Sequence, residues 1–136
     1  KTAISSPATG LMVYDTDLKM ISTYDGAAWS GYKVFRANIS QVGTADPTLT
    51  IFENTTGQTV TVTRDGVGVY LLTFTGTPLT ANKTHIIMGS FGVGGSIYTG
   101  KYNRASNSVI QIDTYDFGVS ADEILDSTAI EIKIYP

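Results

Sequence analysis

The sequence predicts an all-β protein, with an antiparallel β-sandwich or jelly-roll-like domain preceded by an intertwined N-terminal β-hairpin segment. Three observations predict this fold. Apolar and polar residues alternate with a period of two along most of the 136 residues, as they do in half-buried strands. Helical periodicity is almost absent, and turn residues separate the short apolar runs at regular intervals, which is typical of sandwiches and barrels. We divide the chain into a hairpin segment, residues 1–31, and a sandwich domain, residues 32–136.

The hairpin segment is expected to form two short strands, and both faces of the first strand are apolar. The strands are expected at 11–15 and 19–24, with Asp17 near the turn. An isolated two-stranded hairpin is only marginally stable in water, so another surface must cover it. Either the following domain does so, or other copies of the same hairpin do, and we expect the copies. The residues expected at the resulting trimer interface are Leu11, Met12, Val13, Tyr14, Ile21, Tyr24 and Trp29.

Eight strands are predicted in the domain. The last of them has the clearest alternation, with Ile130, Ile132 and Ile134 on one face and Glu131 and Lys133 on the other. We expect the three isoleucines to be buried, because on a solvent face they would form an aggregation-prone edge. The predicted strands span 34–40, 48–53, 59–63, 69–75, 84–91, 96–102, 109–114 and 129–135.

Turn residues mark the connections between these strands. The segments 54–57 and 65–68 are typical of hairpin connections, the second because its Asp-Gly pair tolerates positive φ. One short helical turn is expected at 120–125. There Ser120 is placed to cap the turn, and Glu123 follows three residues later, as a capping box requires.

Composition excludes several classes of function. Only 15% of the residues are charged, the net charge is −3, and no cluster of Lys and Arg is present, so we expect no nucleic-acid partner. No apolar run approaches the roughly 20 residues of a membrane helix, so no membrane insertion is expected. The absence of cysteine excludes disulfides and thiolate chemistry. The chain begins with Lys1 rather than Met, and we interpret it as a fragment of a longer polypeptide.

Two segments resemble parts of phage fibre proteins. Residues 7–17 and 20–29 carry the pattern P-x-x-G-hydrophobic-x-x-Y-D, a tight turn, and then Y-D-G-x-x-W. This pattern resembles a repeat unit of phage tail fibres and of related surface proteins of Bacteroidota and their phages. Residues 32–136 resemble a small β-domain that ends many phage structural proteins, through segments such as 53–57, 63–70, 82–84 and 130–136.

The resemblance implies a structural component of a virion fibre, of the tail or of the head. Such a protein is expected to be an extracellular homotrimer that contacts other virion proteins and attaches to a host cell-surface glycan or protein. The alternative is a bacterial cell-surface adhesin or a carbohydrate-binding module. A fibre-borne depolymerase is a third hypothesis, which would need a longer chain or a site built between subunits.

No catalytic residue, cofactor or metal site is predicted, although a few residues were considered as candidates for catalysis or metal binding. His85 is the single histidine; it lacks a nucleophile motif, and only a trimer could bring three copies around a metal. The pair Glu53 and Asp65 lacks the aromatic cleft of a glycosidase. The glycine-rich stretch 89–95 has no phosphate-loop ending. Four carboxylates near the loop 115–128 are possible Ca²⁺ ligands without EF-hand spacing: Asp113, Asp116, Asp122 and Asp126.

Aromatic residues are the candidates for receptor binding. Flat aromatic rings stack on sugars, and loops on a rigid scaffold are where binding residues concentrate. We therefore expect any receptor contact between residues 91 and 118 rather than on the threonine-coated sheet faces. The candidate residues are Phe91, Tyr98, Tyr102, Tyr115 and Phe117.

Overall fold

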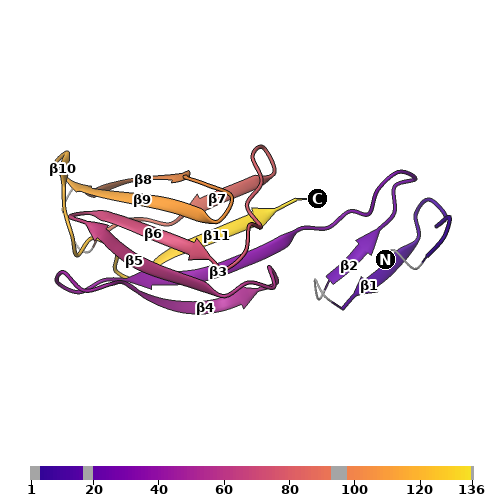
Figure 1. Ribbon diagram of the computed structural model, residues 1–136, viewed down its shortest axis with the longest axis horizontal. Helices are drawn as coiled ribbons and strands as arrows, with labels where there is room; N and C mark the ends of the chain where they lie inside the picture. The colour runs from indigo at the N-terminus through magenta and orange to yellow at the C-terminus, as the bar shows by residue number, and fades with distance from the viewer. Residues whose placement is uncertain (1–3, 17–19, 93–97, 136) are drawn as a thin grey trace.

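The computed structural model describes residues 4–16, 20–92 and 98–135. Within these ranges every regular element is a β-strand, and every strand pair is antiparallel. A two-stranded hairpin is followed by two sheets packed face to face (Figure 1). The predicted fold class, an all-β antiparallel sandwich, is therefore confirmed.

The first sheet contains four strands in the order β4-β3-β11-β7. Their bounds are β3 (Lys33–Ser40), β4 (Thr48–Asn54), β7 (Thr84–Met88) and β11 (Thr128–Ile134). Arg36 pairs with Glu53 while Ala37 pairs with Ile51, so Phe52 is an extra residue on the edge strand. This β-bulge bends and twists β4, which protects an exposed edge from pairing with other chains.

The second sheet is built around β9, which pairs with β6, β8 and β10, while β5 pairs with the far side of β6. The strand bounds are β5 (Val60–Gly66), β6 (Val69–Phe74), β8 (Tyr98–Arg104), β9 (Val109–Asp116) and β10 (Val119–Ser120). All eight predicted domain strands are present, and their described ends differ from prediction by up to three residues. The short β10 was not predicted.

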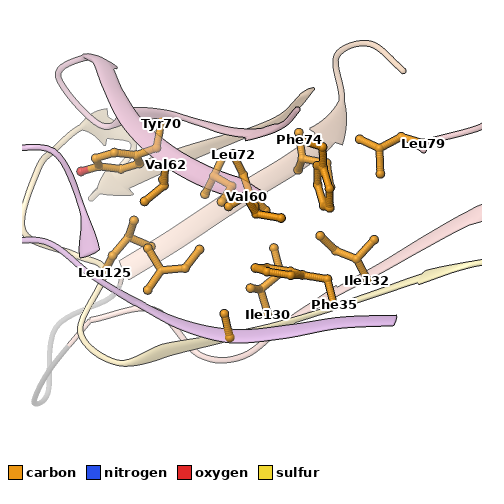
Figure 2. Packing of buried hydrophobic residues seen from close by; sticks show 14 of the residues in the cluster. Phe35, Val60, Val62, Tyr70, Leu72, Phe74, Leu79, Leu125, Ile130 and Ile132 are labelled. Carbon is orange, nitrogen blue, oxygen red and sulfur yellow. The ribbon is translucent and has the colours of Figure 1, made fainter. Parts of the chain in front are cut away.

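The core lies between the two sheets (Figure 2). Ile130, Ile132 and Ile134 are 2%, 0% and 6% exposed, so their predicted burial is confirmed. On the opposite sheet, the buried Val60 and Val62 of β5 alternate with the exposed Thr61 and Thr63, as a period of two requires. Phe35 and Phe74 meet across the interface edge to face, with ring centroids 5.7 Å apart.

The predicted helical turn at 120–125 is wrong. Ser120 is the last residue of β10, and residues 121–127 form an irregular segment that leads to β11. Glu123 has φ of +63°, which a right-handed turn cannot contain. Its carboxylate accepts a hydrogen bond from the backbone N–H of Gly43, 2.8 Å away, instead of capping its own segment. A tertiary contact has overridden the local capping pattern.

The N-terminal hairpin consists of β1 (Met12–Asp15) and β2 (Met20–Thr23). These strands agree with the predicted ones, and the predicted turn residue Asp17 lies outside the described residues. Figure 1 shows the hairpin beyond one end of the sandwich, beside the start of β3 and the end of β11, and not over the outer surface of either sheet.

Candidate functional site

One face of the hairpin is exposed. Tyr14 pairs with Ile21 and Met12 with Thr23, so the three apolar side chains share this face. Met12, Tyr14 and Ile21 are 66%, 63% and 61% exposed. The alternative that the chain's own domain covers the hairpin does not hold for these residues. Leu11 and Val13 are half-buried and belong to the opposite face.

The Y-D-G-x-x-W pattern forms a compact turn after the hairpin. The Tyr24 and Trp29 rings lie 5.4 Å apart, and the two residues are joined by a β-bridge. Asp25 Oδ1 accepts hydrogen bonds from the backbone N–H groups of Ala27 and Ala28, both at 2.8 Å. These N–H groups, Ala28 first, hold the pKa of the Asp25 carboxyl below its ordinary value. Tyr24 and Trp29, expected at a trimer interface, therefore already contact each other within one chain.

The five predicted receptor-binding aromatics do not form one surface. Phe91 is half-buried and packs against the core, with its ring on Gly100, where an added Cβ would lie 2.2 Å from the ring. Tyr98 is also half-buried, and its ring covers Gly92 in the same way. A side chain in place of either glycine would displace the ring that covers it. The two rings thus fasten the segment before 93 to strand β8.

The other three aromatics lie in different settings. Tyr102 on β8 is partly exposed and lies on the inward face of the sheet, beside its β9 partner Ile112. Tyr115 lies on the outer face under the Lys101 ammonium, which is 5.3 Å from the ring centroid. Phe117 is 74% exposed at the turn between β9 and β10. Of the five, Phe117 presents the most open apolar surface.

Phe117 belongs to a group of exposed apolar side chains at the end of the sandwich that lies opposite the hairpin (Figure 1). We call this the distal end and define it as segments 41–47, 64–68 and 116–127. Its exposed apolar residues are Val42, Val67, Phe117 and Val119. Sequence reasoning missed the three valines. The available signal was a β-branched residue directly beside glycine within a predicted connection, where burial is not expected.

The distal end also contains strained backbone. Phe117 has φ of +45°, followed by Gly118 at +85°. Glu123 and Ser127 have φ of +63° and +51°. A bulky residue with positive φ and an exposed ring gains no burial from that conformation. Such outliers cluster where a segment has a function, which makes this turn a candidate contact.

A partly buried ion pair holds the distal segments together. Arg64 donates from Nε to Oδ1 of Asp122 at 3.0 Å and from Nη2 to Oδ2 at 2.8 Å, the bidentate geometry of a strong pair. Asp122 Oδ1 also accepts from the backbone N–H of Gly68 at 3.0 Å. The Arg64 guanidinium holds the pKa of the Asp122 carboxyl below its ordinary value. This carboxylate joins segment 116–127 to the β5–β6 turn.

A second set of hydrogen bonds extends this network to the β3–β4 loop. The buried Tyr70 hydroxyl lies 2.9 Å from Gln41 Oε1 and 3.2 Å from Asp122 Oδ1. Burial raises the pKa of Tyr70 to about 12, so the phenol remains a neutral donor at ordinary pH. Gln41 Oε1 also accepts from the backbone N–H of Glu123 at 2.6 Å. Three loops distant in sequence are thereby fixed to one another.

Gly68 is required at the centre of this network. Its φ is +65°, and an added Cβ would lie 2.6 Å from the carbonyl oxygen of Thr114 and 2.7 Å from the backbone nitrogen of Ala121. Both neighbours are backbone atoms, which cannot move aside as a flexible side chain can. The predicted Asp-Gly connection at 65–68 therefore has a packing role beyond its turn geometry.

The distal end is strongly acidic. Its segments contain six of the nine carboxylates of residues 32–136 but a single cation, Arg64, which Asp122 neutralises. A partner of the distal end therefore meets apolar side chains with a rim of negative charge. The carboxylates are Asp46, Asp65, Asp116, Asp122, Glu123 and Asp126.

The residues considered for catalysis or metal binding do not lie together in one site. His85 is exposed on the outer face of the first sheet, in register with Lys133. Glu53 binds Arg36 on the first sheet, while Asp65 lies in the second. Among the described residues no group of three or more His, Asp or Glu side chains could hold a metal ion. The four carboxylates considered for Ca²⁺ are included in that result.

Comparisons with known proteins return nothing for this chain: no family model matches it, and neither do the curated proteins or the solved structures. The described part of the chain also has no helix that is long and apolar enough to cross a membrane.

Proposed function

We propose that this protein is a structural component of a virion fibre, of the tail or the head, that forms a homotrimer and attaches to the host cell surface. The observation that carries the proposal is that the molecule has two different exposed apolar surfaces, one at each end. An exposed apolar hairpin face lies at one end, and exposed apolar loops lie at the other. The first end suits association between copies, and the second suits contact with a different partner.

The hairpin end supports trimerisation. Met12, Tyr14 and Ile21 form an apolar face on a two-stranded ribbon, an element that is marginally stable alone. Three copies that pack these faces together bury them, and the three sandwich domains then extend from the packed hairpins. In a trimer the distal ends act together, so weak single contacts combine into useful avidity.

The distal end supports attachment. Its loops present open apolar side chains, and the Arg64–Asp122–Tyr70 network fixes the loops in place. A preorganised surface loses less conformational entropy when it binds. We therefore propose that the receptor contact, expected within the region 91–118, is made by Phe117 and its neighbours.

The trimer is tested by native molar mass. Light scattering is expected to give three times the 14.5 kDa chain mass. The triple variant Met12→Ser, Tyr14→Ser, Ile21→Ser is expected to give a folded monomer, because it removes the apolar area that drives association. The matched control is Val42→Ser, which changes an exposed apolar residue at the other end and is expected to stay trimeric. A monomeric wild type, or a trimeric triple variant, contradicts the proposal.

Attachment is tested by adsorption of fluorescent protein to bacterial cells that the wild type binds. The double variant Phe117→Ser, Val119→Ser is expected to reduce adsorption roughly tenfold, since central apolar contacts dominate interface energies. The control Ile51→Ser removes an exposed apolar residue in β4, outside the distal end. Each variant is first shown to keep the wild-type mass. Equal adsorption by the double variant would place the receptor contact elsewhere.

The alternative is a bacterial cell-surface adhesin or a carbohydrate-binding module. Its supporting observation is that the described residues of 32–136 form a sandwich with its own hydrophobic core, as domains that fold alone have. A module of this kind is expected to be monomeric in solution, so the same molar mass measurement separates the two functions.

A further inference from the structure

The exposed apolar side chains of the distal end are mostly aliphatic. Val42, Val67 and Val119 are 79%, 55% and 70% exposed, and Phe117 is the one ring among the four apolar residues of this surface. A valine side chain is branched at Cβ and has no flat face, so it does not stack on a sugar ring. It packs well among the aliphatic and aromatic side chains at the centre of a protein interface. The composition of this surface therefore favours a protein partner over a glycan.

Acidic residues lie in the same segments as these apolar side chains. Asp65 lies two residues before Val67, and Asp116 directly precedes Phe117. Asp65 and Asp126 are exposed, and among the described residues no ion pair involves either of them. A partner that buries the apolar side chains is thus brought close to carboxylates whose charge is not compensated.

Negative charge is concentrated at this end of the molecule. The distal segments hold six carboxylates and one cation, an excess larger than the net charge of −3 of the whole chain, so the rest of the chain is net positive. The distal cation, Arg64, is held by Asp122 in the bidentate pair and is not free to meet an anion. A local excess of one sign attracts a surface of opposite charge and repels a surface of like charge.

Charge complementarity disfavours two partners and favours a third. Anionic glycans, which carry carboxylate, phosphate or sulfate groups, would meet the distal carboxylates without a free cation to bind them. A second copy of the distal end would meet its own negative charge. A protein surface with Lys and Arg around apolar residues compensates the carboxylates and buries the valines together. This arrangement is an apolar centre with a polar rim, as protein interfaces have.

We propose that the distal end binds a host surface protein, at a site where Lys and Arg side chains surround exposed apolar residues. The proposal rests on the attachment role of the proposed function and names the class of the receptor, a protein rather than a glycan. Phe117 and Val119 make the apolar contact, and Asp65 and Asp126 belong to the charged rim. The rim charges speed the encounter, and the buried apolar contacts slow dissociation.

The class of the receptor is tested on cells of a bacterial strain to which the wild type adsorbs. Treatment of the cells with proteinase K, which removes exposed protein, is expected to abolish adsorption. Treatment with periodate, which cleaves the vicinal diols of sugars, is expected to leave adsorption unchanged. Raising the salt concentration from about 50 mM to about 500 mM is expected to slow adsorption about threefold or more, because salt screens the rim charges.

The contribution of the rim is tested with two charge-matched variants. The double variant Asp65→Ser, Asp126→Ser is expected to slow adsorption about fivefold at low salt and to lose most of the salt dependence. The control Glu53→Gln, Asp113→Asn removes the same charge outside the distal end and is expected to adsorb like the wild type. Both variants are first shown to keep the wild-type molar mass.

Three results overturn this inference: adsorption that survives proteinase K, adsorption that is lost after periodate, or equal adsorption rates for the two double variants. The proposed function stands in these cases if the Phe117→Ser, Val119→Ser variant loses adsorption, because the distal end is then still the contact surface. A wild type that adsorbs to no strain of a broad bacterial panel contradicts the attachment role, and this inference with it.

Discussion

Replacing Ile132 with Ala is expected to lower the free energy of unfolding by about 2–5 kcal/mol. Ile132 is 0% exposed, lies in the middle of β11, and is paired with Phe35 on one side and Ile86 on the other. The substitution removes three carbon atoms where backbone is fixed by two neighbouring strands. The site therefore cannot collapse fully, and the remaining cavity adds to the lost transfer free energy.

The measurement is equilibrium unfolding in urea, and the comparison is Val42→Ala. Val42 is among the most exposed apolar residues of the described chain, so its truncation is expected to change stability by less than about 0.5 kcal/mol. Both variants are measured at equal protein concentration, because oligomerisation adds concentration-dependent stability. A loss below about 1 kcal/mol for Ile132→Ala would show that the centre of β11 can repack and is not tightly packed.

The period-two pattern was sufficient to predict the domain strands and their inward faces. Ile130, Ile132 and Ile134 illustrate why: a strand buried on one face must alternate, and a slip of one residue would expose all three. The two-residue β10 could not be predicted, because it is too short to show a period and forms through a turn with positive φ at Phe117 and Gly118. The bulge at Phe52 is likewise invisible in the alternation.

The candidate site was less predictable because loop surfaces depend on contacts between distant segments. Phe91 and Tyr98 lie in a glycine-rich stretch that is typical of a binding loop. In the structure, however, the Phe91 ring packs on Gly100 and the Tyr98 ring packs on Gly92. Glu123 matched a capping box, yet it binds Gly43, 80 residues away in sequence. A local pattern states what a residue can do, and the sheet topology decides which partner it meets.

Replacing Asp122 with Ala is expected to be the most damaging change at the distal end. It leaves the Arg64 guanidinium, the Gly68 N–H and the Tyr70 hydroxyl without their shared carboxylate. Loss of one partner of a fully buried pair costs about 3–5 kcal/mol, whereas exposed pairs contribute less than about 1 kcal/mol. The Arg64 and Asp122 side chains are 20% and 14% exposed, which places the expected loss near 2–3 kcal/mol. Asp126→Ala, an exposed distal carboxylate, is the matched control.

The pH dependence of this loss separates the charge of Asp122 from its packing. The pKa of the Asp122 carboxyl is held below its ordinary value of 3.8, first by the hydrogen bond from Arg64. The folded protein therefore protonates this carboxylate less readily than the unfolded chain does. The stabilisation is therefore complete above the unfolded pKa and is lost as the pH falls through the folded pKa. The difference in unfolding free energy between wild type and Asp122→Ala is expected to be constant from neutral pH down to about 5 and to shrink below 3.8. Asp122→Asn keeps an oxygen that can accept from Gly68 and Tyr70, so it is expected to lose less than Asp122→Ala. A difference from wild type that stays unchanged as the pH falls well below 3.8 would show that the carboxylate charge does not hold the distal loops together.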